Sequence, residues 1–166
     1  MSRAVLSLGS NLGDRLGYLR LAVRGFGDAV RAISPVYETK PWGVTDQGDF
    51  LNAILIVEDA DVDEWGWLRR GQQLEQDAHR ERLQHWGPRT LDVDVVTVDG
   101  VTSTNPELLL PHPGTPTRAS VLVPWHDIDP NADLPGHGPI AQLLTTLDPA
   151  DVAGVRRTDL SLVAAA

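Results

Sequence analysis

Residues 86–96 read Trp86-Gly-Pro-Arg-Thr-Leu-Asp-Val-Asp-Val-Val96, a rigid turn with an arginine followed by a strand pattern that contains two aspartates. Successive side chains of a strand point to opposite faces, so Asp92 and Asp94 share one face. The other face carries apolar residues whose burial sets the register: Leu91, Val93 and Val95. Because aspartate is depleted in strands, the pair indicates a preorganised site for Mg²⁺ and phosphate. A solvated strand face is the alternative for the two aspartates taken alone.

Three arginines precede this strand. Residues 75–82 are predicted to close a helix that carries Arg80 and Arg82, and Arg89 lies in the turn that follows. The chain is acidic overall, with 14 Lys+Arg against 23 Asp+Glu and a formal net charge of -9, so the cluster runs against the composition. Arginine presents a planar fork of donors that matches phosphate oxygens. The cluster therefore favours a specific anion site, with ion pairs to acidic residues of the same helix as the alternative.

Length and composition bound the class of protein. A chain of 166 residues with 42% hydrophobic content predicts a single compact domain over residues 1–166. The lack of cysteine excludes disulfides, thiolate metal sites and a cysteine nucleophile. We find no targeting signal and no apolar run of transmembrane length, and Lys40 is the single lysine. Neither a nucleic-acid partner nor a membrane partner is therefore expected.

The hydrophobic pattern predicts six elements in the order strand, helix, strand, strand, helix, strand. The first three strands are expected at residues 4–8, 29–37 and 50–57, and the helices at residues 16–26 and 61–82, ahead of the strand with the two aspartates. The loop at residues 38–49 is long enough to be functional. This order matches the ferredoxin-like βαββαβ core of α+β proteins, and we expect additional C-terminal strands and helices to decorate it.

The C-terminal part of the chain is rich in proline and glycine. Residues 105–118 are predicted to form a stiff surface loop that carries His112 and Arg118. A lone histidine on a loop is more often a packing or surface residue than a functional one. Residues 121–125 read as a buried segment and residues 140–147 as a short helix, whereas the extreme C-terminus has little structural signal.

Several short motifs follow one another across most of the chain. They are Leu8-Gly-Ser-Asn-Leu-Gly-Asp14, Tyr37-Glu-Thr-Lys-Pro-Trp-Gly43, Gln47-Gly-Asp-Phe-Leu-Asn-Ala53, Trp86-Gly-Pro-Arg-Thr-Leu-Asp-Val-Asp94, Pro111-His112 and Arg118. In this order and spacing they resemble the 6-hydroxymethyl-7,8-dihydropterin pyrophosphokinase family of folate biosynthesis, also called HPPK. The resemblance implies a transferase that moves a pyrophosphoryl group from ATP to the hydroxymethyl group of a reduced pterin and leaves AMP.

The resemblance also implies a set of site residues. Asp92 and Asp94 match the ligands of two Mg²⁺ ions. The residues that match contacts to ATP are Glu75, Arg80, Arg82, Arg89, His112 and Arg118, and the first two of these arginines match a loop that closes over the substrates. The residues that match the pterin pocket are Thr39, Trp42, Phe50 and Asn52. The three arginines that precede the strand and the two aspartates form the implied catalytic set, and closure would exclude water.

Four positions depart from the family pattern. Ser120 stands where the family usually places an aromatic residue that stacks on the second face of the pterin. A lost stacking partner predicts weaker pterin binding by roughly 0.5 to 1.5 kcal/mol. The remaining departures are His79 in place of a usual glycine, Glu81 between two loop arginines, and Pro113 directly after His112.

Two alternatives to the pyrophosphokinase stay open. One is an ATP- and Mg²⁺-dependent relative with a different acceptor alcohol, which Ser120 motivates. The other is a noncatalytic ferredoxin-like binding module, against which the intact aspartates and arginines argue. The resemblance further implies small-molecule substrates, a cytoplasmic location and no obligate protein partner.

Overall fold

A six-stranded antiparallel sheet forms the centre of the computed structural model, which describes residues 2–40, 48–79 and 90–162. The sheet order is β10-β3-β4-β1-β5, and β2 pairs with β4 off this path. The strands are β1 (Ser2–Ser10), β2 (Val30–Ile33), β3 (Tyr37–Thr39), β4 (Phe50–Asp59), β5 (Asp92–Val98) and β10 (Arg156–Arg157). The order of elements along the chain confirms the expected ferredoxin-like βαββαβ core, with its second strand split into β2 and β3.

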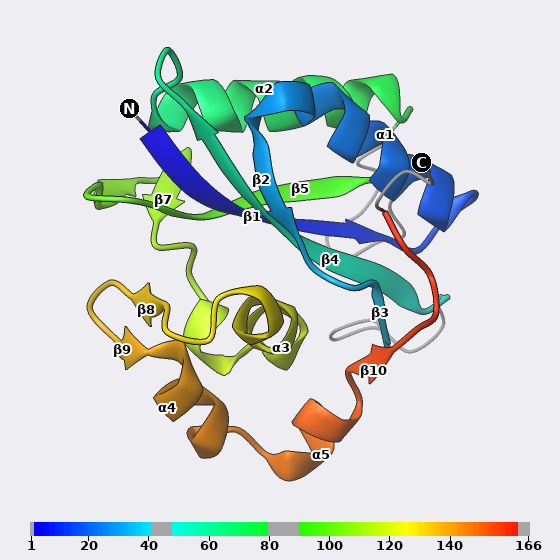
Figure 1. The fold of residues 1–166 in the computed structure, drawn as a ribbon, viewed down its shortest axis with the longest axis vertical. Coiled ribbons are helices and arrows are strands. Elements are labelled where there is room, and N and C mark those ends of the chain that lie inside the picture. Colours follow the sequence, from blue (N-terminus) through cyan, green and yellow to red (C-terminus); the bar gives the residue numbers. More distant parts are fainter. Residues whose placement is uncertain (1, 41–47, 80–89, 163–166) are drawn as a thin grey trace.

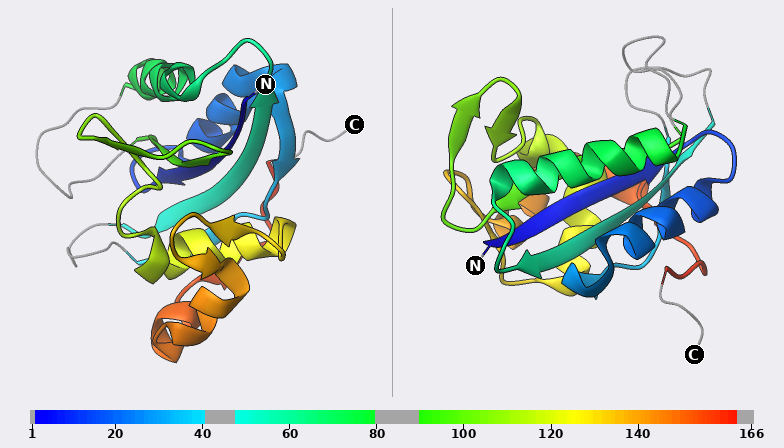
Figure 2. Two further views of the ribbon diagram at one scale, coloured as in Figure 1. Left: turned by 90° about the vertical axis from the view of Figure 1, so that its left-hand side faces the viewer. Right: turned by 90° about the horizontal axis from the view of Figure 1, so that it is seen from above.

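Helices cover both faces of this sheet (Figures 1 and 2). Helices α1 (Arg15–Phe26) and α2 (Glu64–Asp77) pack on one face, and α3 (Ala119–Ile128) packs on the other. The remaining elements are η1 (Gly27–Ala29), β6 (Ser103–Asn105), β7 (Leu108–Leu110), η2 (Thr115–Thr117), β8 (Asp133–Leu134), β9 (Gly138–Pro139), α4 (Ile140–Thr146) and α5 (Pro149–Ala153). Within the three described ranges, every helix falls short of the length and apolar character that a bilayer crossing requires.

Local signals in the sequence explain where the two long helices begin. The side chain of Asp14 accepts a hydrogen bond from the backbone N–H of Gly17, and Asp63 accepts one from Gly66 at 2.7 Å. Aspartate at this position satisfies a backbone donor that the first helical turn would otherwise leave without an intrahelical partner. The caps therefore fix where α1 and α2 begin.

Two apolar cores hold the layers together. Alternate strand residues pack with α1 and α2 in the larger core, whose members include Leu6, Leu8, Leu19, Phe26, Ala53, Leu55, Trp67, Leu74, Leu91, Val93 and Val95. The opposite strand face packs with α3 in a second core, whose members include Val5, Ile54, Ile56, Val96, Leu122 and Trp125. The burial of the apolar residues around the two aspartates confirms the predicted register of the last core strand.

Helix α2 ends earlier than the sequence suggests. It closes at Asp77, and His79 has a backbone φ of 59°, in the left-handed region that residues with side chains rarely adopt. A left-handed residue directly after a helix terminates it, and glycine occupies this conformation at least cost. The helix expected to continue beyond residue 77 therefore ends at Asp77, and residues 80–82 lie outside the part of the chain that the structure describes.

Other expectations also need correction. The strand predicted at residues 29–37 breaks after Ile33, where the hydroxyl of Ser34 accepts a hydrogen bond from the backbone N–H of Ile54 at 2.8 Å. The stiff surface loop predicted at residues 105–118 instead contributes to the hairpin β6–β7, which buries two alternating leucines, Leu108 and Leu110. The sequence pattern missed α5 and β10, because such short elements carry little periodicity.

Candidate active site

The strand face that packs on α3 changes character toward one end of the sheet. Along each of three neighbouring strands, apolar core residues are followed on the same face by small, polar or aromatic residues. On β1, Val5 is followed by Ser7 and Gly9; on β4, Ile56 and Ile54 are followed toward the same end by Asn52 and Phe50. On β5, Val96 is followed in the same direction by Asp94 and Asp92. In the sheet register Gly9 lies between Asn52 and Asp92. Because glycine has no side chain, this row leaves space above β1.

A cavity of about 550 Å³ occupies this end of the sheet. It brings together six residues predicted from the sequence, which come from β3, β4, β5 and the segment before α3: Thr39, Phe50, Asn52, Asp92, Asp94 and Arg118. Ser120 also lines the cavity from α3. Groups suited to a cation and groups suited to a flat heterocycle therefore face one partly open cavity.

A residue of α2 hydrogen-bonds to the backbone of the strand that carries the two aspartates. The carboxylate of Glu75 is buried, with 5% of the residue exposed, and accepts a hydrogen bond from the backbone N–H of Val93 at 3.0 Å. Val93 lies between Asp92 and Asp94, on the outer edge of the sheet. A charged acceptor on a strand backbone makes a stronger bond than a neutral one. Glu75 thus supports the geometry of the pair, and it is not among the residues that line the cavity.

His112 stands beside this pair. Its Nε2 atom lies 3.9 Å from Asp94 Oδ1, and its backbone N–H donates to the carbonyl of Val96 at 2.8 Å. The pKa of His112 is lowered, mainly by burial and further by the positive charge of Arg118. The hydrogen bond between the ring and the carbonyl of Pro113, and the negative charge of Asp92, raise this pKa but do not offset the lowering. A neutral ring whose Nδ1–H donates to Pro113, 2.8 Å away, leaves Nε2 as an acceptor near the cavity.

The opposite wall of the cavity is built by β3 and β4. Thr39 and Phe50 are directly opposed in the antiparallel register. The amide nitrogen of Asn52 donates to Thr39 Oγ1 at 2.7 Å. This bond orients the amide so that its carbonyl oxygen lies over Gly9, 3.5 Å from where a Cβ would stand. The arrangement offers a ring face from Phe50 and a hydrogen-bond acceptor from Asn52.

Tyr37 anchors the same strand to α3. Its hydroxyl donates to the carboxylate of Asp127, and Arg157 approaches that carboxylate at 3.9 Å. The pKa of Tyr37 is raised to about 12. Burial is the largest cause, and the hydrogen bond to Asp127 and the negative charge of Asp127 add to it, whereas the positive charge of Arg157 lowers the pKa. The phenol therefore remains protonated at neutral pH and holds β3 beside α3.

Several predicted residues fall outside the described ranges, and others were not foreseen. Trp42, Arg80, Arg82 and Arg89 lie in residues 41–47 and 80–89, outside the part of the chain that the structure describes. The cavity is also lined by residues that the sequence did not single out: Ser7, Lys40, Thr117, Ala150, Asp151, Gly154, Val155 and Arg156. Ser7 could have been found because it shares a strand face with Gly9, two residues on, whereas the C-terminal residues carry no motif.

The carboxylate pair suits a cation that takes most of its ligands from substrate phosphates and water rather than from the protein. Among the described residues, no group of three or more His, Asp or Glu side chains is arranged to hold a metal ion. Mg²⁺ is usually bound through one or two carboxylates together with substrate phosphates and water, rather than by an all-protein cage. Two aspartates that face a cavity therefore fit a Mg²⁺–nucleotide complex.

Fold and site together define a ferredoxin-like α+β protein with two carboxylates that face a cavity at one end of its sheet. The family model of 7,8-dihydro-6-hydroxymethylpterin-pyrophosphokinase (HPPK) matches residues 5–130, and the chain belongs to this family. The expected resemblance is confirmed.

Curated relatives agree over nearly the whole chain. The 2-amino-4-hydroxy-6-hydroxymethyldihydropteridine pyrophosphokinase of Mycobacterium tuberculosis (strain ATCC 25618 / H37Rv) is 48% identical over 168 residues, which cover 94% of this chain and 89% of that protein. The protein of the same name from Mycobacterium leprae (strain TN) is 47% identical over 175 residues, which cover 98% and 92%.

Solved structures share the fold at low sequence identity. The HPPK-DHPS triple mutant S436F/A437G/A613S of Plasmodium falciparum with SDX-DHP has a TM-score of 0.68 and 16% identity to this chain. The similarity covers 87% of this chain but only 44% of that longer one. At this identity, the likeness shows the fold alone.

Proposed function

We propose that the cavity between the sheet and α3 is where this chain transfers pyrophosphate from ATP to the hydroxymethyl group of 6-hydroxymethyl-7,8-dihydropterin. The products are AMP and the pterin diphosphate, a step of folate biosynthesis, and ATP is the cosubstrate of the family. The observation that carries the proposal is the convergence of the carboxylate pair and the heterocycle-facing residues on one cavity. An alcohol acceptor and a phosphate donor must meet in such a space for transfer to occur.

The proposed roles of the described residues follow from their positions. Asp92 and Asp94 would hold two Mg²⁺ ions together with the phosphates of ATP. When bound, these ions would neutralise charge on the transferring group and orient the attacking and leaving oxygens. Glu75 keeps the backbone of the pair in register, and Arg118 offers donors to phosphate oxygens from the segment before α3. His112 would present an acceptor on the nucleotide side.

The acceptor would bind over Gly9. Phe50 would stack on one face of the pterin, while Asn52 and Thr39 would meet polar groups on its edge. Ser120 faces the same cavity but cannot supply a second ring. Trp42 is a further proposed member of this pocket, and Arg80, Arg82 and Arg89 are proposed phosphate contacts whose approach would exclude water. These four assignments rest on the family resemblance.

One second candidate has a specific observation in its favour. The serine at the stacking position supports a relative that keeps the ATP half of the site but accepts a different alcohol. Retention of the two aspartates in the cavity opposes a noncatalytic binding module. We also propose that residues 1–166 form one domain and act in the cytoplasm.

Product analysis tests the proposed reaction. Wild-type protein incubated with Mg²⁺, 6-hydroxymethyl-7,8-dihydropterin and ATP labelled in its γ-phosphate is expected to yield AMP and labelled pterin diphosphate in equal amounts. Formation of ADP, or of inorganic phosphate without pterin modification, would contradict pyrophosphoryl transfer. A parallel panel of alcohols separates the second candidate: faster AMP formation with another alcohol would assign a different acceptor.

A further inference from the structure

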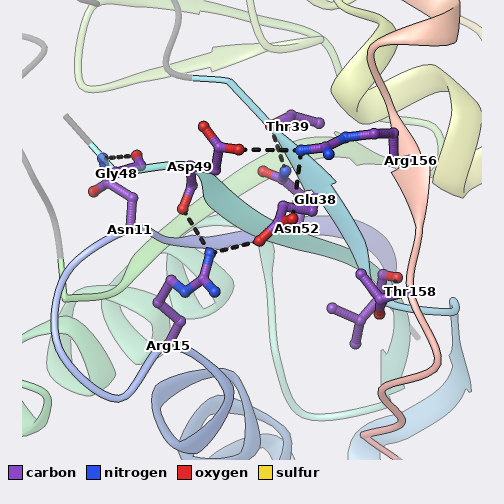
Figure 3. Close-up of polar contacts among 10 residues, drawn as sticks. Asn11, Arg15, Glu38, Thr39, Gly48, Asp49, Asn52, Arg156 and Thr158 are labelled. Carbon is purple, nitrogen blue, oxygen red and sulfur yellow. Dashed lines mark hydrogen bonds and ion pairs between the residues drawn. The ribbon is translucent and has the colours of Figure 1, made fainter. Parts of the chain in front are cut away.

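Two arginines link Glu38 of β3 to Asp49, the residue before β4 (Figure 3). Arg15, at the start of α1, donates to Glu38 Oε2 at 2.9 Å and to the backbone carbonyl of Asp49 at 2.9 Å. Arg156, on β10, donates to Asp49 Oδ2 at 3.0 Å and to Glu38 Oε1 at 3.4 Å. A guanidinium therefore joins Glu38 to Asp49 from each side.

The residues held by this bridge are chain neighbours of the acceptor wall. Glu38 precedes Thr39, and Asp49 precedes Phe50. Thr39 and Phe50 are directly opposed in the β3–β4 register and both line the cavity. A change in the separation of Glu38 and Asp49 is therefore expected to move Thr39 and Phe50, whose side chains are proposed to bind the pterin.

Backbone pairing places Arg156 at this point. In the antiparallel pairing of β10 with β3, Arg156 lies opposite Glu38. The next residues continue the contact: the backbone N–H and hydroxyl of Thr158 both donate to the carbonyl of Val36, at 2.9 and 2.8 Å. Arg156 lies beyond residues 5–130, the part of the chain that the family model matches. Its role therefore does not follow from the family motifs.

We propose that Arg156 is a positioning residue for the acceptor: it acts through Asp49 and Glu38 to hold Thr39 and Phe50 against the pterin. The inference rests on the proposed function and adds a C-terminal contribution to it. The side chain of Arg156 is 55% exposed, so these ion pairs are individually weak and sensitive to salt. The effect of Arg156 falls on pterin affinity, because its ion pairs go to Glu38 and Asp49, the chain neighbours of Thr39 and Phe50 in the acceptor wall.

Steady-state kinetics of Arg156→Ala test this role. We expect the KM for the pterin to rise about fivefold, with kcat and the KM for ATP within about twofold of wild type. Arg156→Lys should recover part of the loss, since an ammonium can pair with Asp49 but cannot span both carboxylates as a planar fork. Arg69→Ala is the matched control, because Arg69 is also an exposed arginine paired with a carboxylate, Glu107 at 3.3 Å, but does not line the cavity, and its pterin KM should stay near the wild-type value.

A double-mutant cycle with Asp49→Asn distinguishes positioning from direct contact with the pterin. If Arg156 acts through Asp49, the pterin KM of the double variant should be close to that of Arg156→Ala alone. Additive losses, an unchanged pterin KM, or equal losses for ATP and pterin would overturn the proposal. Lack of the AMP and pterin diphosphate products in wild type would instead refute the proposed function. Pterin affinity of the same variants, measured by fluorescence titration, would then decide the positioning claim.

Discussion

Asp94→Ala is expected to lower kcat at least about 1,000-fold while leaving the fold intact. Asp94 faces the cavity from β5, directly opposite Ser7 on β1, and its side chain is 28% exposed. Removal of the carboxylate deletes half of the proposed metal-binding pair, whereas the apolar face of β5 keeps its packing against α1 and α2. Turnover at saturating ATP, pterin and Mg²⁺, together with a thermal melt, measures both parts of the prediction.

A matched substitution separates loss of this carboxylate from loss of negative charge. Asp99→Ala removes an exposed aspartate just beyond the end of β5, and its kcat should stay within about twofold of wild type. Near-normal Mg²⁺-dependent turnover in Asp94→Ala would remove the central site assignment. A collapsed melting transition would show that the side chain is needed for folding, and Asp94→Asn would then carry the kinetic comparison.

Gly9→Val is expected to weaken pterin binding about 100-fold without a matching loss of ATP binding. A Cβ at position 9 would lie 3.4 Å from Phe50 Cδ1 and 3.5 Å from Asn52 Oδ1, which are ordinary contacts or close to them. The branched methyl groups of valine would extend further, into the space between Asn52 and Asp92 that the acceptor is proposed to fill. Titration with pterin in the presence of a non-hydrolysable ATP analogue measures the effect.

Gly9→Ala is the control for this steric prediction. A single methyl group fits the contacts at Phe50 and Asn52, so the alanine variant should bind the pterin within about fivefold of wild type. β-branched residues are favoured in strands, so the valine variant should remain folded. Pterin affinity that is equal in the valine variant and in wild type would place the acceptor away from β1.

The sequence predicted the parts of the fold that repeat with a clear period. The alternation around Asp92 and Asp94 placed both carboxylates on one face, and the opposite face is buried as expected. The helical spacing from Leu16 to Phe26 likewise predicted α1. Such patterns are readable because a whole face must be buried for an element to be stable.

Contacts made by residues far apart in the sequence could not be predicted in this way. The hydrogen bond that Glu75 accepts from the backbone N–H of Val93 depends on how α2 packs against β5, and no spacing rule encodes it. The position of Arg156 depends on a pairing of two-residue β10 with β3, too short to leave a periodic signal. The left-handed conformation of His79 was hidden because only a small fraction of residues other than glycine adopt a positive φ.

Manganese binding tests the central claim most directly, because it reports on the carboxylate pair without requiring turnover. Mn²⁺ can replace Mg²⁺ as a hard, oxygen-liganded cation that is visible by electron paramagnetic resonance. With a non-hydrolysable ATP analogue present, wild-type protein should show a tightly bound Mn²⁺ signal, and Asp92→Asn/Asp94→Asn should weaken Mn²⁺ binding by about 100-fold or more. Equal Mn²⁺ affinity and an unchanged spectrum in the double variant would contradict the assignment of this cavity as the site of pyrophosphoryl transfer.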